Sequence, residues 1–156
     1  MKILLSISLF ILSLYGQNYT YLIDEYDKVI DLEAKIITKI AKDITKNEKI
    51  NLYIPDIRQI DEKVYSTKLN IVNSCKKADF IFVKYDEKNL KCKNINNKYF
   101  FTNNYKKLLN NKKYLGAFFW SKSRPNIVLI KGRLVKNNIN LKKEYNKFVE
   151  DYNNEY

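Results

Sequence analysis

Histidine is absent from this chain of 156 residues, and glycine, proline and cysteine are scarce. Without histidine, the protein lacks the commonest general base, the commonest metal ligand and the side chain that titrates near neutral pH. Three glycines are too few for a phosphate-binding loop or a dinucleotide-binding fingerprint. The acidic residues are dispersed, and the pair Asp61 and Glu62 is expected to be solvated near a helix N-terminus. We therefore expect no metal site, no cofactor and no enzymatic activity.

One catalytic arrangement stays open, a Ser–Lys dyad between Lys122 and either Ser121 or Ser123. Neighbouring residues in a turn rarely face one another, so we do not favour it.

Long apolar runs are missing after the first residues of the chain. Lys2 is followed by an uncharged, mostly apolar run from Ile3 to Tyr15. This run is too short to span a membrane and is typical of a signal-peptide core. We place the cleavage after Gly16, so that residues 1–16 are a signal peptide and residues 17–156 are one exported domain. An uncleaved N-terminal anchor is the alternative.

The formal net charge of +12 invites an anionic partner. Lysine is abundant together with asparagine, isoleucine and tyrosine, which is the composition that an AT-rich genome produces. Solvated lysines on every exposed face therefore explain most of the charge, and nucleic acid is not expected as a partner. Lipid headgroups, anionic envelope polymers and acidic protein surfaces remain alternatives.

Helical and strand patterns alternate along the first half of the chain, and a hairpin enters in the second half. Apolar residues at steps of three and four predict a helix from Leu22 to Thr45 that packs on a sheet. Short apolar runs predict four strands, and weaker periodic segments predict helices between and after them. The expected strands are Ile50–Ile54, Leu69–Val72, Phe80–Val83 and Tyr99–Thr102; the expected helices are Ile57–Ser66, Tyr105–Asn111, a turn within Gly132–Asn138, and a final helix after Asn140 that carries Leu141, Tyr145, Phe148, Val149 and Tyr152 on one face.

The segment Tyr114–Lys131 predicts a β-hairpin. Its apolar arms are Tyr114–Phe119 and Ile127–Ile130, and a polar turn from Ser121 to Asn126 separates them. Neither arm alternates between apolar and polar residues, so both faces are expected to be covered. The fold class is therefore α/β, a single domain with a mixed five- or six-stranded sheet and helices on both faces.

The two cysteines predict a disulfide. Cys75 precedes the strand Phe80–Val83, and Cys92 follows the return from that strand, so the two ends are expected to meet. An even cysteine count in an exported chain favours a bridge. We expect a structural bond, with a redox-sensitive bond as the alternative.

The candidate binding surface combines the ends of the predicted strands with the hairpin turn. Asn103 and Asn104 follow a strand at the place where open α/β sheets form crevices. Trp120 and Arg124 are residue types that anchor interfaces. The alternative is that Trp120 closes the core and Arg124 is only solvated. The candidate residues are Asn103, Asn104, Trp120, Arg124, Asn126 and Arg133.

The order of these features resembles the YfiR-like family of small periplasmic proteins. The segments that carry the resemblance are Leu32–Ile37 in the first helix, Cys75–Val83, Phe101–Asn104, Gly116–Phe119, Asn126–Ile130 and Gly132–Val135. The similarity covers nearly all of the mature chain by pattern rather than by a sharp motif. Two features depart from the family. Lys131-Gly132-Arg133 follows the return strand where the family more often continues with Ile-Asn, and only one cysteine pair is present.

The resemblance implies a periplasmic regulator without enzymatic activity. Members of the family bind the periplasmic sensor domain of an inner-membrane diguanylate cyclase, and a disulfide affects their state. We therefore expect an adaptor that contacts a membrane signalling protein, a diguanylate cyclase or a sensor kinase. The alternative is a small-molecule-binding module resembling one lobe of a periplasmic solute receptor, with its site near Asn103 and Asn104.

Overall fold

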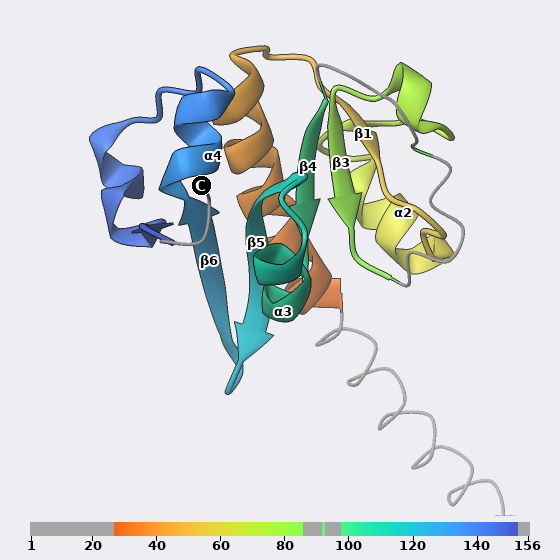
Figure 1. The fold of residues 1–156 in the computed structure, drawn as a ribbon. Coiled ribbons are helices and arrows are strands. Elements are labelled where there is room, and N and C mark those ends of the chain that lie inside the picture. The colour runs from red at the N-terminus through yellow and green to blue at the C-terminus, as the bar shows by residue number, and fades with distance from the viewer. Residues whose placement is uncertain (1–26, 86–91, 93–97, 153–156) are drawn as a thin grey trace, which may run out of the picture.

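A mixed seven-stranded sheet runs through the part of the chain that the computed structural model describes, residues 27–85, 92 and 98–152 (Figure 1). The predicted signal peptide lies outside these residues. The strands are β1 (Asn51–Tyr53), β2 (Asn70–Ile71), β3 (Phe80–Val83), β4 (Tyr99–Thr102), β5 (Tyr114–Ser121), β6 (Arg124–Ile130) and β7 (Val149–Glu150).

The spatial order of the strands is β2-β1-β3-β4-β5-β6-β7. The first five strands of this order are parallel, β6 pairs antiparallel with β5, and β7 pairs parallel with β6. The predicted α/β class with one mixed sheet is confirmed, although the sheet has seven strands rather than five or six. β7 was not foreseen as a strand.

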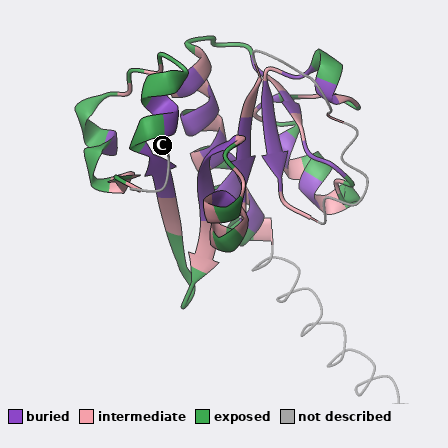
Figure 2. Cartoon of the chain, viewed as in Figure 1, coloured by how far each residue is buried: buried purple, intermediate pink, exposed green. Residues whose placement is uncertain are grey.

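Both faces of the sheet are covered, as the sequence predicted. Phe80 and Phe82 of β3 point to one face, where they join a core with the first helix. Ile81 and Val83 point to the other face. Figure 2 shows the buried residues concentrated along the strands. The shorter helices are α2 (Gln59–Tyr65), the 3₁₀ turn η1 (Cys75–Lys77), α3 (Tyr105–Asn110), α4 (Lys131–Lys136) and the 3₁₀ helix η2 (Lys143–Phe148).

The first helix is described over residues 27–45. Ile30, Ala34, Ile37, Ala41 and Ile44 are buried in the core, so the predicted apolar stripe faces the sheet. The predicted start of this helix lies outside the described residues. No helix in the described part of the chain is both long enough and apolar enough to span a membrane.

Gly116 marks an irregularity in the pairing of β4 with β5. Phe100 pairs with Tyr114 and Phe101 with Gly116, so one extra residue of β5 bulges between them. A Cβ atom on Gly116 would lie 2.5 Å from the carbonyl oxygen of Val128 and 2.6 Å from the ring of Phe101. Only glycine therefore lets the Phe101 ring and β6 approach β5 this closely.

The predicted disulfide between Cys75 and Cys92 is present. Their Cα atoms are 5.7 Å apart, and the bond closes a sequence separation of 17 residues. Cys75 is buried in the core of the second face, and Cys92 packs against it.

The hairpin turn is tighter than the sequence predicted. Ser121 pairs with Arg124, so only Lys122 and Ser123 form the loop. Both have left-handed backbone angles, with φ of 48° and 59°, which matches the right-handed twist of the flanking strands. Pro125 therefore lies within β6, where it pairs with Trp120, rather than in the turn.

The expected final helix is wrong. Residues after Asn140 form the 3₁₀ helix η2 and then β7, which pairs with β6 through Leu129 and Val149. Tyrosine, asparagine, phenylalanine and valine are weak helix formers, and the outer edge of β6 offers them unpaired backbone groups instead.

Candidate functional site

The strand order places a topological switch point between β1 and β3. The chain passes from β1 to β2 on one side and then crosses to β3 on the other. Open α/β sheets bind ligands at the carboxyl ends of the strands beside such a point. Here the carboxyl end of β1 leads to Pro55 and α2, and that of β3 leads to Lys84 and Tyr85.

A buried ion-pair network occupies this place. The Nζ atom of Lys84 lies 2.5 Å from Oε1 of Glu33 and 2.7 Å from Oδ1 of Asp61. The side chains of Lys84, Glu33 and Asp61 are 9%, 6% and 0% exposed, respectively. The ammonium group is therefore shared between two carboxylates that solvent barely reaches.

Three further side chains complete the network. Arg58 Nε donates to Oδ2 of Asp61 at 2.7 Å, and the Tyr85 hydroxyl donates to the same oxygen. The Tyr65 hydroxyl donates to Oε1 of Glu33 at 2.9 Å. Glu33 lies on the first helix, so the network also ties that helix to α2 and to the end of β3.

The protonation states follow from these contacts. Burial raises the pKa of Asp61, but hydrogen bonds from Arg58, Lys84 and Tyr85 outweigh burial and leave this pKa below its ordinary value. Burial, followed by the charge of Glu33, raises the pKa of Tyr65 well above its ordinary value. Burial and the bond to Asp61 likewise raise the pKa of Tyr85. The carboxylate of Asp61 thus stays ionised, and both hydroxyls stay protonated as donors.

The network closes the switch point with side chains that already have partners. The expectation that Asp61 is solvated is wrong, since its side chain is fully buried. A sequence signal for the network did exist. Glu33 lies three residues after Ile30 and four before Ile37, inside the buried stripe of the first helix. A charged residue at such a position needs a buried partner, and this requirement is the signal from which the network could have been predicted.

Asn103 and Asn104 lie at the carboxyl end of β4, as predicted. Asn104 is exposed and caps α3, because its Oδ1 accepts a hydrogen bond from the backbone nitrogen of Lys107 at 3.1 Å. The backbone nitrogen of Asn103 donates to the carbonyl of Val83 at 3.2 Å. A hollow of about 330 Å³ lies beside them, lined by Asn104, Lys106, Lys107, Asn110, Asn111 and Tyr114.

Trp120, Arg124 and Asn126 all lie near the hairpin tip, but Trp120 points to one face of the hairpin and Arg124 and Asn126 to the other, because Trp120 pairs with Pro125 and Asn126 with Phe119. Trp120 is half-buried and packs edge-to-face on Phe118, with ring centroids 5.8 Å apart. Arg124 is exposed, and its carbonyl accepts a hydrogen bond from the Asn126 side chain at 2.9 Å.

Arg133 lies apart from the other candidate residues. Arg133 follows β6. The carboxyl end of β6 lies at the opposite end of the strand from the hairpin tip. Arg133 is 3% exposed. Its NH1 group donates to the carbonyls of Leu108 at 2.8 Å, Asn111 at 3.2 Å and Tyr114 at 2.7 Å. It therefore holds the connection between α3 and β5.

The hairpin extends beyond both of its neighbours in the sheet. The last residue of β5 that pairs with β4 is Ala117, opposite Thr102, and β5 continues to Ser121. On the other side, the pairing of β7 with β6 begins only at Leu129. The β5–β6 hairpin is exposed at its tip and projects from the sheet (Figures 1 and 2).

Among the described residues, no group of three or more acidic or cysteine side chains could hold a metal ion.

Comparisons with protein-family models, with curated proteins and with solved structures find no match for this chain.

Proposed function

We propose that this chain is an exported, periplasmic adaptor without enzymatic activity that contacts a membrane signalling protein, a diguanylate cyclase or a sensor kinase. The observation that carries the proposal is the projecting hairpin. Its β5 edge beyond Ala117 and its β6 edge before Leu129 have no strand partner among the described residues. Such edges present backbone donors and acceptors to an extended segment of another protein.

The tip of the hairpin restricts which partners suit it. Lys122 and Arg124 are exposed, and Pro125 removes one backbone donor from the β6 edge. These features disfavour pairing between copies of this basic chain and favour an acidic segment of a partner. Trp120, half-buried at the base of the tip, offers an aromatic anchor on the face of the hairpin opposite to Arg124.

The closed switch point supports a role without catalysis. The position where this strand order forms a ligand crevice is filled by Lys84, Asp61 and Glu33, and each of these groups already has partners. The sequence has no histidine to serve as a general base. The resemblance to the YfiR-like family also supports a regulator without enzymatic activity.

The test combines capture with a signalling readout. A photo-cross-linking amino acid replaces Ser123, and this variant is expressed in the organism that encodes the protein. Membrane proteins that become cross-linked to it are identified by mass spectrometry. We expect a diguanylate cyclase or a sensor kinase, captured less by Arg124→Glu and Trp120→Ala than by the control Lys136→Glu, which changes an exposed charge on α4. If nothing is cross-linked and deletion of the gene leaves cyclic-di-GMP unchanged, the adaptor proposal fails.

A small-molecule-binding module is the second candidate. The hollow beside Asn104 favours it, because this is the crevice position that the sequence indicated. A thermal-shift screen of small anions and amino acids tests this candidate. A ligand whose stabilising effect disappears in Asn104→Ala would support it, and the absence of any stabilising ligand would refute it.

A further inference from the structure

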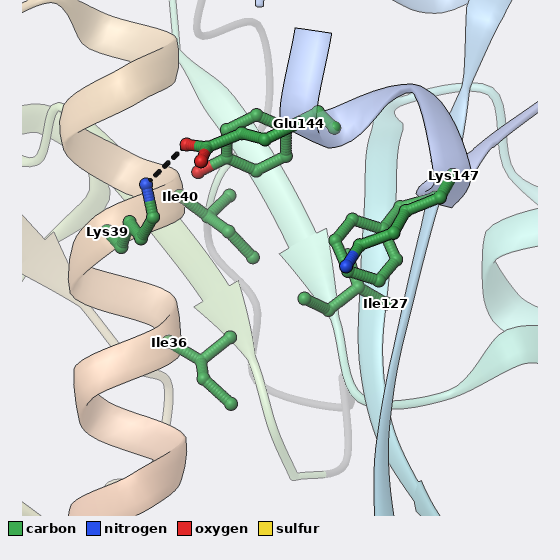
Figure 3. A pocket seen from close by; sticks show the side chains of 8 residues that line it. Ile36, Lys39, Ile40, Ile127, Glu144 and Lys147 are labelled. Atoms are coloured by element: carbon green, nitrogen blue, oxygen red, sulfur yellow. Dashed lines mark hydrogen bonds and ion pairs between the residues drawn. The ribbon is translucent and has the colours of Figure 1, made fainter. Parts of the chain in front are cut away.

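A second cavity lies on the other side of the sheet, between the first helix, β6 and η2 (Figure 3). Its volume is about 220 Å³. The lining residues are Ile36, Lys39, Ile40, Ile127, Glu144, Tyr145, Lys147 and Phe148. None of the candidate site residues predicted from the sequence lines this cavity, and the proposed adaptor function does not use it.

The walls of the cavity are apolar and fixed. Ile36 and Ile40 come from the first helix, and Ile127 faces them from β6 (Figure 3). Tyr145 and Phe148 close the third side, with their rings packed edge-to-face at 6.4 Å. These walls provide a water-excluding surface for an apolar group.

Tyr145 anchors η2 to the first helix. Its hydroxyl donates to Oδ2 of Asp43 at 2.7 Å. Burial and this hydrogen bond raise the pKa of Tyr145 above its ordinary value, so the hydroxyl stays protonated as a donor. The hydrogen bond between Tyr145 and Asp43 therefore holds η2 close to the first helix on either side of the cavity.

The rim of the cavity carries charge that is only partly compensated. Lys39 contacts Glu144 at 2.7 Å and Asp43 at 3.2 Å, so its charge is balanced. Lys147 has no carboxylate partner among the described residues. Its ammonium group lies 4.9 Å from the ring centroid of Phe148, directly at the rim. The apolar cavity therefore has one available cation at its mouth.

Size and charge together define an occupant. A dry engineered cavity of about 150 Å³ holds one benzene ring, whereas sites for drug-sized ligands begin at about 300 Å³. A volume of about 220 Å³ fits a single ring or a chain of about six carbons. We propose that this cavity binds a small amphipathic monocarboxylate, with its apolar part between Ile36, Ile40 and Ile127 and its carboxylate at Lys147.

The proposal does not rest on the adaptor function, and its test needs no partner protein. Hexanoate and benzoate are titrated into the full chain by calorimetry, and hexanol and benzyl alcohol are titrated as uncharged equivalents. We expect a dissociation constant of about 1 mM for the carboxylates, as befits ligands of this size. We expect binding of the alcohols to be about three- to fivefold weaker, because an exposed ion pair adds only a modest gain.

Two variants locate the site. Lys147→Gln should weaken binding of the carboxylates about three- to fivefold and leave the alcohols unchanged. Lys143→Gln, an exposed position on the same 3₁₀ helix that does not line the cavity, is the matched control and should change neither. Ile36→Phe should fill the cavity and abolish binding of both probes, with circular dichroism confirming the fold.

Three outcomes of these titrations would refute the proposal. No heat of binding for either carboxylate at 20 mM would refute it, as would equal affinity for carboxylates and alcohols. Equal effects of Lys147→Gln and Lys143→Gln would place any bound carboxylate elsewhere on the surface. If Ile36→Phe does not fold, the comparison of the two lysine variants still decides the question.

Discussion

Replacing Lys84 with methionine removes the only cation that contacts both Glu33 and Asp61 among the described residues. Methionine keeps most of the length and apolar stem of lysine, so packing changes little and the loss of charge dominates. Breaking a buried ion pair from one side costs about 3–5 kcal/mol, since the partner charges stay buried without compensation. Small domains have unfolding free energies of about 5–15 kcal/mol, so the variant should keep its fold but lose a large part of its stability.

The matched control is Lys68→Met. Lys68 Nζ contacts Oδ1 of Asp31 at 2.6 Å, a distance similar to those in the buried network. The side chains of this pair are 20% and 37% exposed, so solvent already screens the interaction. Urea unfolding followed by circular dichroism should therefore show a much smaller loss for this variant than for Lys84→Met. Equal losses, or a loss below about 1 kcal/mol for Lys84→Met, would refute the view that the buried network stabilises this fold.

The pH dependence provides a second readout of the same network. The pKa of Asp61 is lowered in the folded protein by its hydrogen bonds, after burial has acted in the opposite direction. Its contribution to stability is therefore fully present above the ordinary pKa of about 3.9 and is lost as pH falls further through the folded value. The stability difference between wild type and Lys84→Met should accordingly shrink as pH falls below about 4, since a protonated Asp61 no longer needs the ammonium. A difference that stays constant over this range would contradict the assignment.

Three further predictions concern the frame of the fold. Changing both Cys75 and Cys92 to alanine should lower the unfolding free energy by about 3 kcal/mol in urea titrations, and reducing the wild type should have the same effect; an unchanged midpoint would contradict this. Gly116→Ala should cost about 1–3 kcal/mol, because its Cβ atom would meet the carbonyl of Val128 at 2.5 Å, and a melting temperature equal to that of wild type would show that β5 and β6 adjust freely. Arg133→Met should cost about 2–4 kcal/mol and speed amide hydrogen exchange in α3, since three carbonyls lose a charged donor, and unchanged exchange would argue against this role.

The sequence was most informative where local pattern and tertiary context agree. Phe80–Val83 and Tyr99–Thr102 are strands with the predicted bounds, because short aromatic and β-branched runs between polar segments have few other uses in a chain of this size. The first helix was predictable because its apolar stripe is long and regular over its described part. The disulfide followed from the strand that lies between its two cysteines.

The errors arose where distant partners decide the outcome. The segment around Tyr145 has a helical apolar spacing, but the open edge of β6 and the carboxylate of Asp43 draw it into a 3₁₀ helix and a strand. Asp61 resembles a solvated residue of a first helical turn, and only the position of Lys84 after β3 makes it a buried partner. Among the candidate site residues, Arg133 illustrates the same limit. Its role depends on three carbonyls that are 19 to 25 residues away in the sequence.

The cavity beside η2 joins two parts of the chain that are synthesised far apart in time. Lys39 and Glu144 are separated by 105 residues, and Asp43 and Tyr145 by 102. β7 adds only two residues to the sheet, so the C-terminal segment is held by few backbone bonds. Segments of this kind detach in local openings that cost less than global unfolding. The cavity exists only while the segment is docked, so a molecule bound there would hold η2 against the first helix and slow the opening of this segment. Binding in this small cavity would thereby favour the docked state of the segment that contains η2 and β7.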